Sequence, residues 1–238
     1  MTGQLPKIIC ILGATGTGKT DLALFLAKKI DISVINFDSR QVYKELPIVT
    51  AQPGVEEQSV CPHYLYGFLT IREKISAGEF VSLASDLIWR EWKRGRVPVL
   101  VGGTGLYLRS LLYGLAPIPP VPDSARKEVK QKCEKYGPEK LYQELEKIDP
   151  EYARKIHARD RQRIIRALEV YLGTGVTISN WHKRHKPELK FLALKVGLSY
   201  NLDDLTKRLD ARIDKMIALG AVEEVENAYK VYKDETLP

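Results

Sequence analysis

Lys7-Ile8-Ile9-Cys10-Ile11-Leu12 runs directly into Gly13-Ala14-Thr15-Gly16-Thr17-Gly18-Lys19-Thr20 near the start of the chain. The first six residues are a nearly continuous apolar run, which predicts a short, buried parallel strand. A helix is expected from Thr20 to about Lys29. The eight residues from Gly13 match the pattern G-x-x-x-x-G-K-[ST] in the context that this pattern requires, a strand before and a helix after.

A loop of this kind binds phosphate for electrostatic reasons. Its glycines let backbone N–H groups converge on phosphate oxygens, and the N-terminus of the following helix adds partial positive charge. Lys19 supplies a full positive charge, and the hydroxyl of Thr20 can bind Mg²⁺. We therefore predict a site for a di- or triphosphate, made by Gly13, Ala14, Thr15, Gly16, Thr17, Gly18, Lys19 and Thr20.

Two more apolar segments, 33–37 and 97–101, are predicted strands that end at Asp38 and Gly102. Between them, apolar residues at helical spacing predict a helix over 80–94. Strands that alternate with helices indicate a parallel sheet, in which ligands bind at the carboxyl ends of the strands. The phosphate-binding loop, Asp38 and Gly102 all lie at such ends.

The alternation stops at residues 113–123, where four of the thirteen prolines fall within six residues. Neither a helix nor a central strand can run through such a segment, so we predict a domain boundary there. Residues 123–172 then show a purely helical pattern, with Asp123 as the expected N-cap and a break at 136–138.

The expected helix over 160–172 has two different faces. One carries Ile164, Ile165, Leu168 and Leu172 as a buried stripe, and the other carries Arg159, Arg163 and Arg166 as a basic stripe. Further on, residues 191–196 are predicted to return to the first sheet as a strand, and 202–230 are predicted to be helical with an interruption at Gly220. The fold class is therefore α/β, a P-loop NTPase-like parallel sheet core (1–115 and 190–238) with an inserted all-helical subdomain (116–189).

Positive charge is concentrated in one part of the chain. Residues 153–190 hold ten Lys and Arg against three acidic residues, so the other 200 residues balance at 27 basic and 27 acidic and the net charge of +7 lies in this segment. Three of the four histidines and Trp181 also fall in the segment. This composition favours a surface that binds a polyanion over a solvated helix face with incidental charge.

The composition excludes several classes of protein. With 44% hydrophobic and 28% charged residues, the chain is an ordinary globular one rather than a disordered one. No apolar run is long enough to span a bilayer or to act as a signal peptide, which predicts a cytoplasmic protein with no membrane partner. Cys10, Cys61 and Cys133 are odd in number and far apart, so we expect buried thiols and no disulfide framework or zinc site.

The loop alone does not identify the reaction, because kinases, NTPases and other transferases share it. An acid at the end of a strand often holds Mg²⁺ in such proteins, and Asp38 could do so. However, Asp38 begins the polar run Asp38-Ser39-Arg40-Gln41-Val42-Tyr43, which offers hydrogen-bonding groups for a ligand larger than a metal ion. The strand at 97–101 ends without an acid, which disfavours an ordinary motor ATPase.

Four blocks occur in order along the chain: the phosphate-binding loop, residues 38–53 (DSRQVYKELPIVTAQP), residues 102–115 (GGTGLYLRSLLYGL) and residues 162–169 (QRIIRALE). Together they resemble the tRNA dimethylallyltransferases over almost the whole chain. The resemblance implies transfer of a dimethylallyl group from dimethylallyl diphosphate to N6 of adenosine 37, next to the anticodon, in tRNAs that read codons starting with U. It also implies that the loop holds the diphosphate of an isoprenoid, so that ATP is not consumed.

The resemblance further implies roles for single residues. Asp38 would be the general base toward the N6 amine, acting with Thr104 and Lys19, and Arg212 would approach the diphosphate. Contacts with the tRNA anticodon stem-loop would come from Asp38, Ser39, Arg40, Gln41, Thr104, Arg126, Gln162, Arg163, Ile164, Ile165 and Arg166. Simpler roles stay open: Asp38 as a water-mediated Mg²⁺ ligand, Thr104 as a turn hydroxyl, and Arg126, Arg166 and Arg212 as solvated helix arginines. Mg²⁺, with Thr20 as its protein ligand, is the expected cofactor, and a monomer is expected.

The chemistry agrees with these residues. An allylic diphosphate ionises toward a stabilised cation, so catalysis requires mainly neutralisation of the leaving diphosphate, by Lys19, Mg²⁺ and Arg212, and alignment of the nucleophile. An exocyclic adenine amine is a poor nucleophile, and a carboxylate such as Asp38 can accept its proton as the new bond forms. Because that base is stacked in the anticodon loop, it must be extruded into the pocket, and the basic helical insertion would grip the RNA.

Three rival functions share some of these features. A prenyltransferase that acts on free AMP, ADP or ATP would need the same loop and base but no grip on an anticodon. A small-molecule kinase with a helical lid would place Arg159, Arg163 and Arg166 on ATP, and an RNA-binding P-loop module without activity would leave Asp38 unexplained.

The sequence departs from the family in one respect, because the family usually continues beyond the position of Pro238. From this difference we expect either a truncated form or a reduced activity.

Overall fold

The computed structural model describes residues 4–233 and divides the chain into two compact units. Unit 1 combines the chain up to Gly114 with the chain from Glu188 onward, and unit 2 is Leu115–Pro187. Residues 114–122, the proline-rich segment, contain no helix or strand. Because proline has no N–H to donate, the chain leaves unit 1 here without regular structure.

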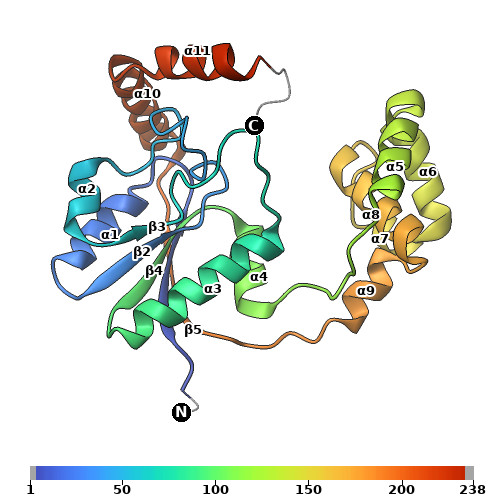
Figure 1. Cartoon of the computed structure of the whole chain (residues 1–238), viewed down its shortest axis with the longest axis horizontal. Helices are drawn as coiled ribbons and strands as arrows, with labels where there is room; N and C mark the ends of the chain where they lie inside the picture. The colour runs from blue at the N-terminus through green and yellow to red at the C-terminus, as the bar shows by residue number, and fades with distance from the viewer. Residues whose placement is uncertain (1–3, 234–238) are drawn as a thin grey trace. The chain divides into compact units, whose positions relative to one another are not determined.

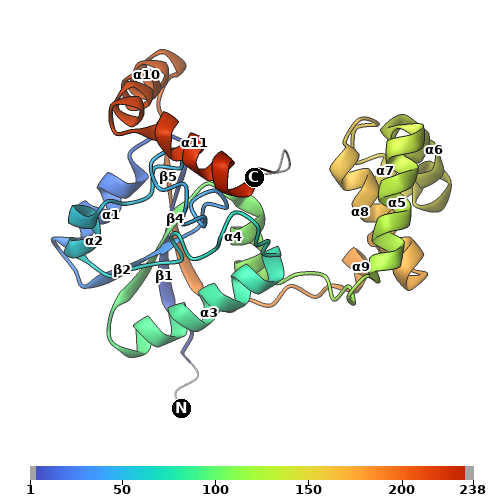
Figure 2. The same ribbon diagram turned by 45° about the horizontal axis from the view of Figure 1, so that its top comes forward.

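Unit 1 is built on a sheet of five parallel strands in the order β3-β2-β4-β1-β5 (Figures 1 and 2). The strands are β1 (Lys7–Gly13), β2 (Ile32–Asn36), β3 (His63–Tyr64), β4 (Val97–Gly102) and β5 (Leu192–Leu198). The predicted α/β class is confirmed, and β5 returns to the sheet as predicted; the structure places it beside β1. The sequence did not reveal β3, because two residues carry no periodic pattern.

Helices cover both faces of the sheet at its centre, where β2 and β4 are almost entirely buried, whereas the edge strand β5 is largely exposed. On one face, Cys10 packs with the buried side chains of α3 (Ala77–Lys93) and α4 (Gly105–Tyr113). On the other, Ile11 packs with α1 (Lys19–Ala27), and α2 (Val55–Val60) lies in the connection between β2 and β3. The ring of Phe80 on α3 stacks on Tyr107 of α4 at 4.1 Å, and both rings also contact Phe37, which follows β2.

The helix predicted over 80–94 is α3, which begins three residues earlier. Ser76 and Glu79 explain the difference, because they form a capping box in which each side chain accepts a hydrogen bond from the backbone N–H of the other. Helix α4 follows the Gly102-Gly103-Thr104 turn and was not predicted. The three cysteines are buried and free, as expected.

Unit 2 consists of helices packed around their own core. They are α5 (Asp123–Tyr136), α6 (Pro138–Ile148), α7 (Pro150–Ala153), α8 (Arg161–Thr174) and α9 (Ile178–Arg184). Val129, Leu141, Leu145, Ile164 and Leu168 are among the buried residues of this core. The predicted break at 136–138 is confirmed, since α5 ends at Tyr136 and α6 begins at Pro138.

Three details of the prediction for unit 2 were wrong. Asp123 is the first residue of α5, and Pro122 occupies the N-cap position. Arg159 precedes α8, which begins at Arg161 behind an Asp160 N-cap, and it pairs with Glu139 instead of extending the basic stripe. Leu172 is 46% exposed, because the buried stripe of α8 continues through Val170 instead.

Two helices follow β5 in unit 1, as predicted: α10 (Leu202–Ala218) and α11 (Ala221–Tyr232). Gly220 interrupts them with a φ of 93°, a conformation that favours glycine.

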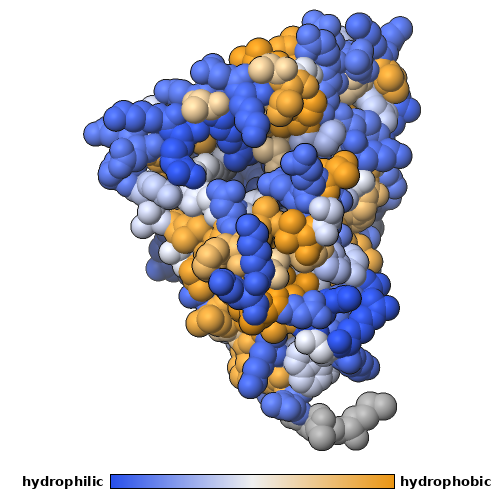
Figure 3. Space-filling view, turned by 90° about the vertical axis from the view of Figure 1, so that its left-hand side faces the viewer, coloured by the Kyte–Doolittle hydropathy of each residue, from blue (hydrophilic) through white to orange (hydrophobic). Residues whose placement is uncertain are grey.

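Figure 3 views the molecule from the side on which α1, α2 and α10 lie in Figure 1, and apolar patches interrupt its polar surface. Val55 of α2 and Ile213 and Ile217 of α10 are among the exposed apolar residues of unit 1. Within residues 4–233, no helix is both long and apolar enough to cross a membrane.

Candidate active site

The phosphate-binding loop joins the carboxyl end of β1 to the N-terminus of α1. Gly16 and Gly18 have φ values of 85° and 81°, which a residue with a side chain rarely adopts, so the loop depends on these glycines. Thr17 is buried and donates its hydroxyl to the carbonyl of Ala14 at 2.8 Å, which closes the loop on itself. Thr20 follows on the first turn of α1, with its side chain half-buried.

The ammonium group of Lys19 lies within the curve of this loop. Its Nζ donates hydrogen bonds to the carbonyls of Gly13 at 2.9 Å and Ala14 at 2.8 Å. Burial lowers the pKa of Lys19, the charge of Asp38 opposes that shift, and the charge of Arg212 adds to it. Lys19 therefore lies within electrostatic reach of both Asp38, which follows β2, and Arg212 on α10.

Asp38 is held in place by Asn36, the last residue of β2. The side chain of Asn36 is fully buried; its Nδ2 donates to the carbonyls of Asp38 (3.0 Å) and Leu65 (2.8 Å), and its Oδ1 accepts from the N–H of Asp38 (2.7 Å). One carboxylate oxygen of Asp38 accepts from the N–H of Arg40 at 2.9 Å. Sequence reasoning missed Asn36, although an amide at the end of an otherwise apolar strand is a signal that could have revealed it.

Two tyrosines lie near the Asp38 carboxylate. Burial raises the pKa of Tyr66 and of Tyr107, and the negative charge of Asp38 contributes to both shifts. Both phenols are therefore neutral at physiological pH and can donate hydrogen bonds. Neither tyrosine was predicted as a site residue.

Thr104 connects the end of β4 to the Asp38 block. Its hydroxyl oxygen accepts a hydrogen bond from the N–H of Ser39 at 3.1 Å, and its own N–H donates to the carbonyl of Phe37 at 3.2 Å. Beside it, the chain at Gly102 runs so close to β2 that a Cβ there would collide with the carbonyl group of Phe37 and come within 2.8 Å of the Asp38 nitrogen. The structure thus brings together the predicted residues Lys19, Asp38, Ser39, Thr104 and Arg212.

The side chains of Gln41 and Arg40, in the same block, differ in their contacts. The amide Nε2 of Gln41 donates to the carbonyls of Thr50 (3.1 Å) and Ala51 (2.6 Å), so it is engaged inside the connection that follows β2. Arg40 is exposed. Gln41 therefore shapes the connection, whereas the Arg40 side chain is accessible to a ligand.

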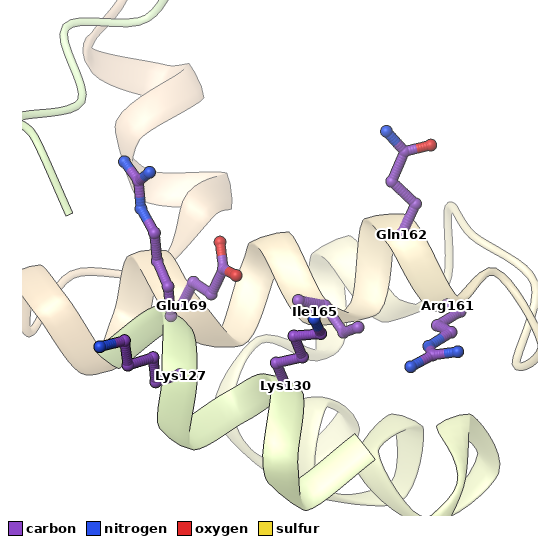
Figure 4. A pocket seen from close by; sticks show the side chains of 7 residues that line it. Lys127, Lys130, Arg161, Gln162, Ile165 and Glu169 are labelled. Carbon is purple, nitrogen blue, oxygen red and sulfur yellow. The ribbon is translucent and has the colours of Figure 1, made fainter. Parts of the chain in front are cut away.

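The remaining predicted RNA-contact residues lie on α5 and α8 of unit 2. A pocket of about 490 Å³ between these helices is lined by Arg126, Lys127, Lys130, Arg161, Gln162, Ile165 and Glu169 (Figure 4). In Figure 4, Lys127 and Lys130 extend from α5, and the labelled residues from Arg161 onward extend from α8. Sequence reasoning had named three of these residues and missed Lys127, Lys130, Arg161 and Glu169, because contact between two helices is not visible in a linear pattern.

Among the predicted contacts on α8, two arginines are exposed and one isoleucine is not. Arg163 pairs with Asp160 at 3.1 Å and Arg166 with Glu169 at 3.7 Å, at the surface of the helix. The side chain of Ile164 is fully buried in the core of unit 2. Ile164 therefore holds the helix in place, and its assignment as a contact residue is corrected on that ground.

Comparison with known proteins agrees with this geometry. The family model described as IPP transferase matches residues 41–238. A protein named tRNA dimethylallyltransferase from Maridesulfovibrio salexigens is 51% identical over 231 residues, which cover 97% of this chain and 75% of that protein. One of the same name from Salinibacter ruber is 40% identical, covering 94% of this chain and 69% of that protein.

Two solved structures are also similar. A eukaryotic dimethylallyltransferase acting on tRNA aligns with a TM-score of 0.83 and 33% identity, over 98% of this chain and 58% of that one. The full-length tRNA isopentenylpyrophosphate transferase of Bacillus halodurans aligns with a TM-score of 0.65 and 34% identity, over 97% of this chain and 72% of that one. The chain thus spans about three quarters of its first curated relatives and 58% of the eukaryotic enzyme.

The close approach at Gly102 generates a prediction with a matched control. Gly102→Ala should lower the free energy of unfolding by about 1–3 kcal/mol, because the added methyl group must displace the Phe37–Asp38 backbone. At the neighbouring residue, a Cβ on Gly103 would meet only the Gly13 carbonyl, at 3.5 Å, so Gly103→Ala should change stability by less than about 0.5 kcal/mol. Urea unfolding of both variants measures the difference, and equal stabilities would contradict the contact.

Proposed function

Because the chain belongs to the IPP transferase family, we propose that it transfers a dimethylallyl group from dimethylallyl diphosphate to N6 of adenosine 37 of tRNA and releases diphosphate. The observation that supports this function best is the position of Asp38. A carboxylate at the end of β2 lies within electrostatic reach of the lysine of a phosphate-binding loop, which combines a proton acceptor with a site for a leaving diphosphate. We further propose that the protein acts as a monomer in the cytoplasm, where tRNA is found.

The donor diphosphate would bind in the loop from Gly13 to Thr20. The N-terminus of α1 lies at this loop, and Lys19 and Arg212 add two positive charges. Oxygen ligands suit Mg²⁺, so the Thr20 hydroxyl and the diphosphate oxygens would hold the ion, which when bound supplies charge neutralisation. These groups stabilise the negative charge that develops on the diphosphate as the allylic C–O bond breaks.

The acceptor amine would be deprotonated by Asp38. As the amine nitrogen forms its bond to the allylic carbon, its proton passes to the Asp38 carboxylate, which Asn36 and the Arg40 N–H hold in position. Thr104 fixes the adjoining turn through the N–H of Ser39. The base must leave the stacked anticodon loop to reach this point, so the RNA has to be held elsewhere as well.

We assign this additional binding of the RNA to unit 2. The pocket between α5 and α8 presents four cationic side chains, those of Arg126, Lys127, Lys130 and Arg161, with the Gln162 amide beside them. Cationic side chains of this kind neutralise phosphates, and an amide can hydrogen-bond to a base edge. Arg163 and Arg166 are two further exposed cations of α8.

One assay distinguishes this function from its rivals. The chain is incubated with radiolabelled dimethylallyl diphosphate and Mg²⁺, together with either unmodified tRNA or AMP. We expect label in tRNA alone, at the adenosine next to the anticodon. Label in AMP would identify a free-nucleotide prenyltransferase. Label in neither acceptor, together with phosphoryl transfer from ATP to AMP in a parallel sample that contains ATP, would favour a kinase.

Replacement of the proposed base tests its role directly. Asp38→Asn should retain the affinity for both substrates and lose about 10²–10⁴ in kcat, because an amide of the same shape cannot accept the proton. Single-turnover rates and equilibrium binding measure the two effects separately. A near-normal kcat with a higher requirement for Mg²⁺ would instead make Asp38 a residue of the metal site.

The grip on RNA is tested by salt dependence. Neutralising Arg163 and Arg166 together should leave the fold intact, because Ile164 and Leu168 hold the opposite face of α8. tRNA affinity should fall, and the slope of log K against log salt should become shallower by about 0.7 per lost phosphate contact. The affinity for dimethylallyl diphosphate should not change. Equal slopes and equal tRNA affinity would remove these two arginines from the RNA surface.

A further inference from the structure

Helix α10 packs directly on the phosphate-binding loop. Arg208 donates from Nε to the carbonyl of Gly16 at 3.0 Å. Leu205 and Leu209 lie against the same residue, so closely that a Cβ on Gly16 would come within 2.9 Å of Leu209 Cδ2. The loop is therefore supported from outside by a helix that lies almost two hundred residues further along the chain.

Helix α11 is attached to a different loop. The carboxylate of Glu224 accepts hydrogen bonds from two successive backbone amides, Ile48 N–H on Oε1 and Val49 N–H on Oε2, both at 2.8 Å. At the other end of the helix, the Tyr232 hydroxyl donates to Oε1 of Glu45 at 2.6 Å. Two points of α11 thus fix residues 45–49.

Residues 45–49 belong to the connection 38–53, which starts with Asp38. Gln41 donates to the carbonyls of Thr50 and Ala51, and Gln52 donates to the carbonyl of Tyr43 at 2.7 Å, so the connection is internally cross-linked. Ala51 has a φ of 50°, an unfavourable value for a residue with a side chain, which persists only where the surroundings enforce it. Because the connection is cross-linked, the contact of Glu224 with Ile48 and Val49 also constrains the position of Asp38 at its start.

We propose that Glu224 is a positioning residue for the transfer reaction. Helix α10 supports the phosphate-binding loop, and α11 holds the connection 38–53. The pair α10–α11 therefore fixes the position of Asp38 relative to the loop, and Glu224 provides the contact with the connection that carries Asp38. This inference rests on the proposed function, since it takes Asp38 as the base and the loop as the site of the isoprenoid diphosphate.

The chemistry of the contact explains why a carboxylate is needed. Two neighbouring N–H groups require two acceptor atoms, and a carboxylate offers both. Gln at this position would accept one bond and turn an N–H toward the other donor. Glu224→Gln therefore removes one contact with almost no change in the size of the side chain.

The experiment compares Glu224→Gln with Glu223→Gln. Glu223 lies on the same first turn of α11 and is exposed, so the control removes the same charge from the same helix end without touching residues 48–49. For Glu224→Gln we expect a higher KM for tRNA and a lower kcat, with kcat/KM down by about tenfold. The dissociation constant of dimethylallyl diphosphate should stay within about twofold of the parent value, which shows that donor binding is intact. Glu223→Gln should behave as the parent. Faster hydrogen exchange at the Ile48 and Val49 amides should accompany the change.

Other results would overturn the inference. A Glu224→Gln variant equal to Glu223→Gln would do so, and so would a lower kcat at unchanged KM, which indicates a smaller folded fraction. Tyr232→Phe is the second variant: it removes the hydroxyl bond to Glu45 and should raise the KM for tRNA in the same direction, and an unchanged KM there would also contradict the proposal. A parent chain that binds dimethylallyl diphosphate but labels no tRNA would overturn the proposed function itself.

Discussion

The ends of β2 and β4 meet at Gly102, and the geometry of the candidate site depends on this contact. Only a residue without a Cβ lets the β4 backbone lie against the carbonyl of Phe37. The close approach brings Thr104 within hydrogen-bonding distance of Ser39 and fixes the turn that begins with Asp38. Since parallel strands direct their carboxyl ends to one edge of the sheet, Asp38 then lies on the same edge as the phosphate-binding loop.

The donor and acceptor sides of this site are electrically coupled. Burial and the nearby Arg212 both lower the pKa of Lys19, and the charge of Asp38 opposes them. The carboxylate therefore supports the charged form of the lysine, in addition to any role toward a substrate amine. A bound diphosphate would, like Asp38, place negative charge near Lys19. It would therefore also favour the charged form of the lysine.

The sequence allowed much of unit 1 to be predicted, because its signals are local. The loop pattern, the apolar strands and the break at Gly220 each depend on a few neighbouring residues. What it did not reveal depends on contacts between distant segments. Examples are the buried Asn36 amide that orients Asp38, and the lysines of α5 that face Arg161 of α8 across the pocket. Periodicity located α8 but assigned Leu172 to its buried face, since a helix of this length has a buried stripe whose exact course is set by its neighbours.

The proposed RNA substrate must be bound while one of its bases is extruded, and the two units carry separate groups for these two tasks. Flipping a stacked base costs a few kcal/mol, which contacts to the RNA backbone have to offset. Unit 2 offers cations for such contacts, whereas Asp38, the proposed proton acceptor, and the phosphate-binding loop belong to unit 1. The units are joined by two segments without helix or strand, 114–122 and 185–190. With RNA bound to unit 2 as proposed, its contact with unit 1 becomes an intramolecular step, which raises the effective concentration of the target base near Asp38.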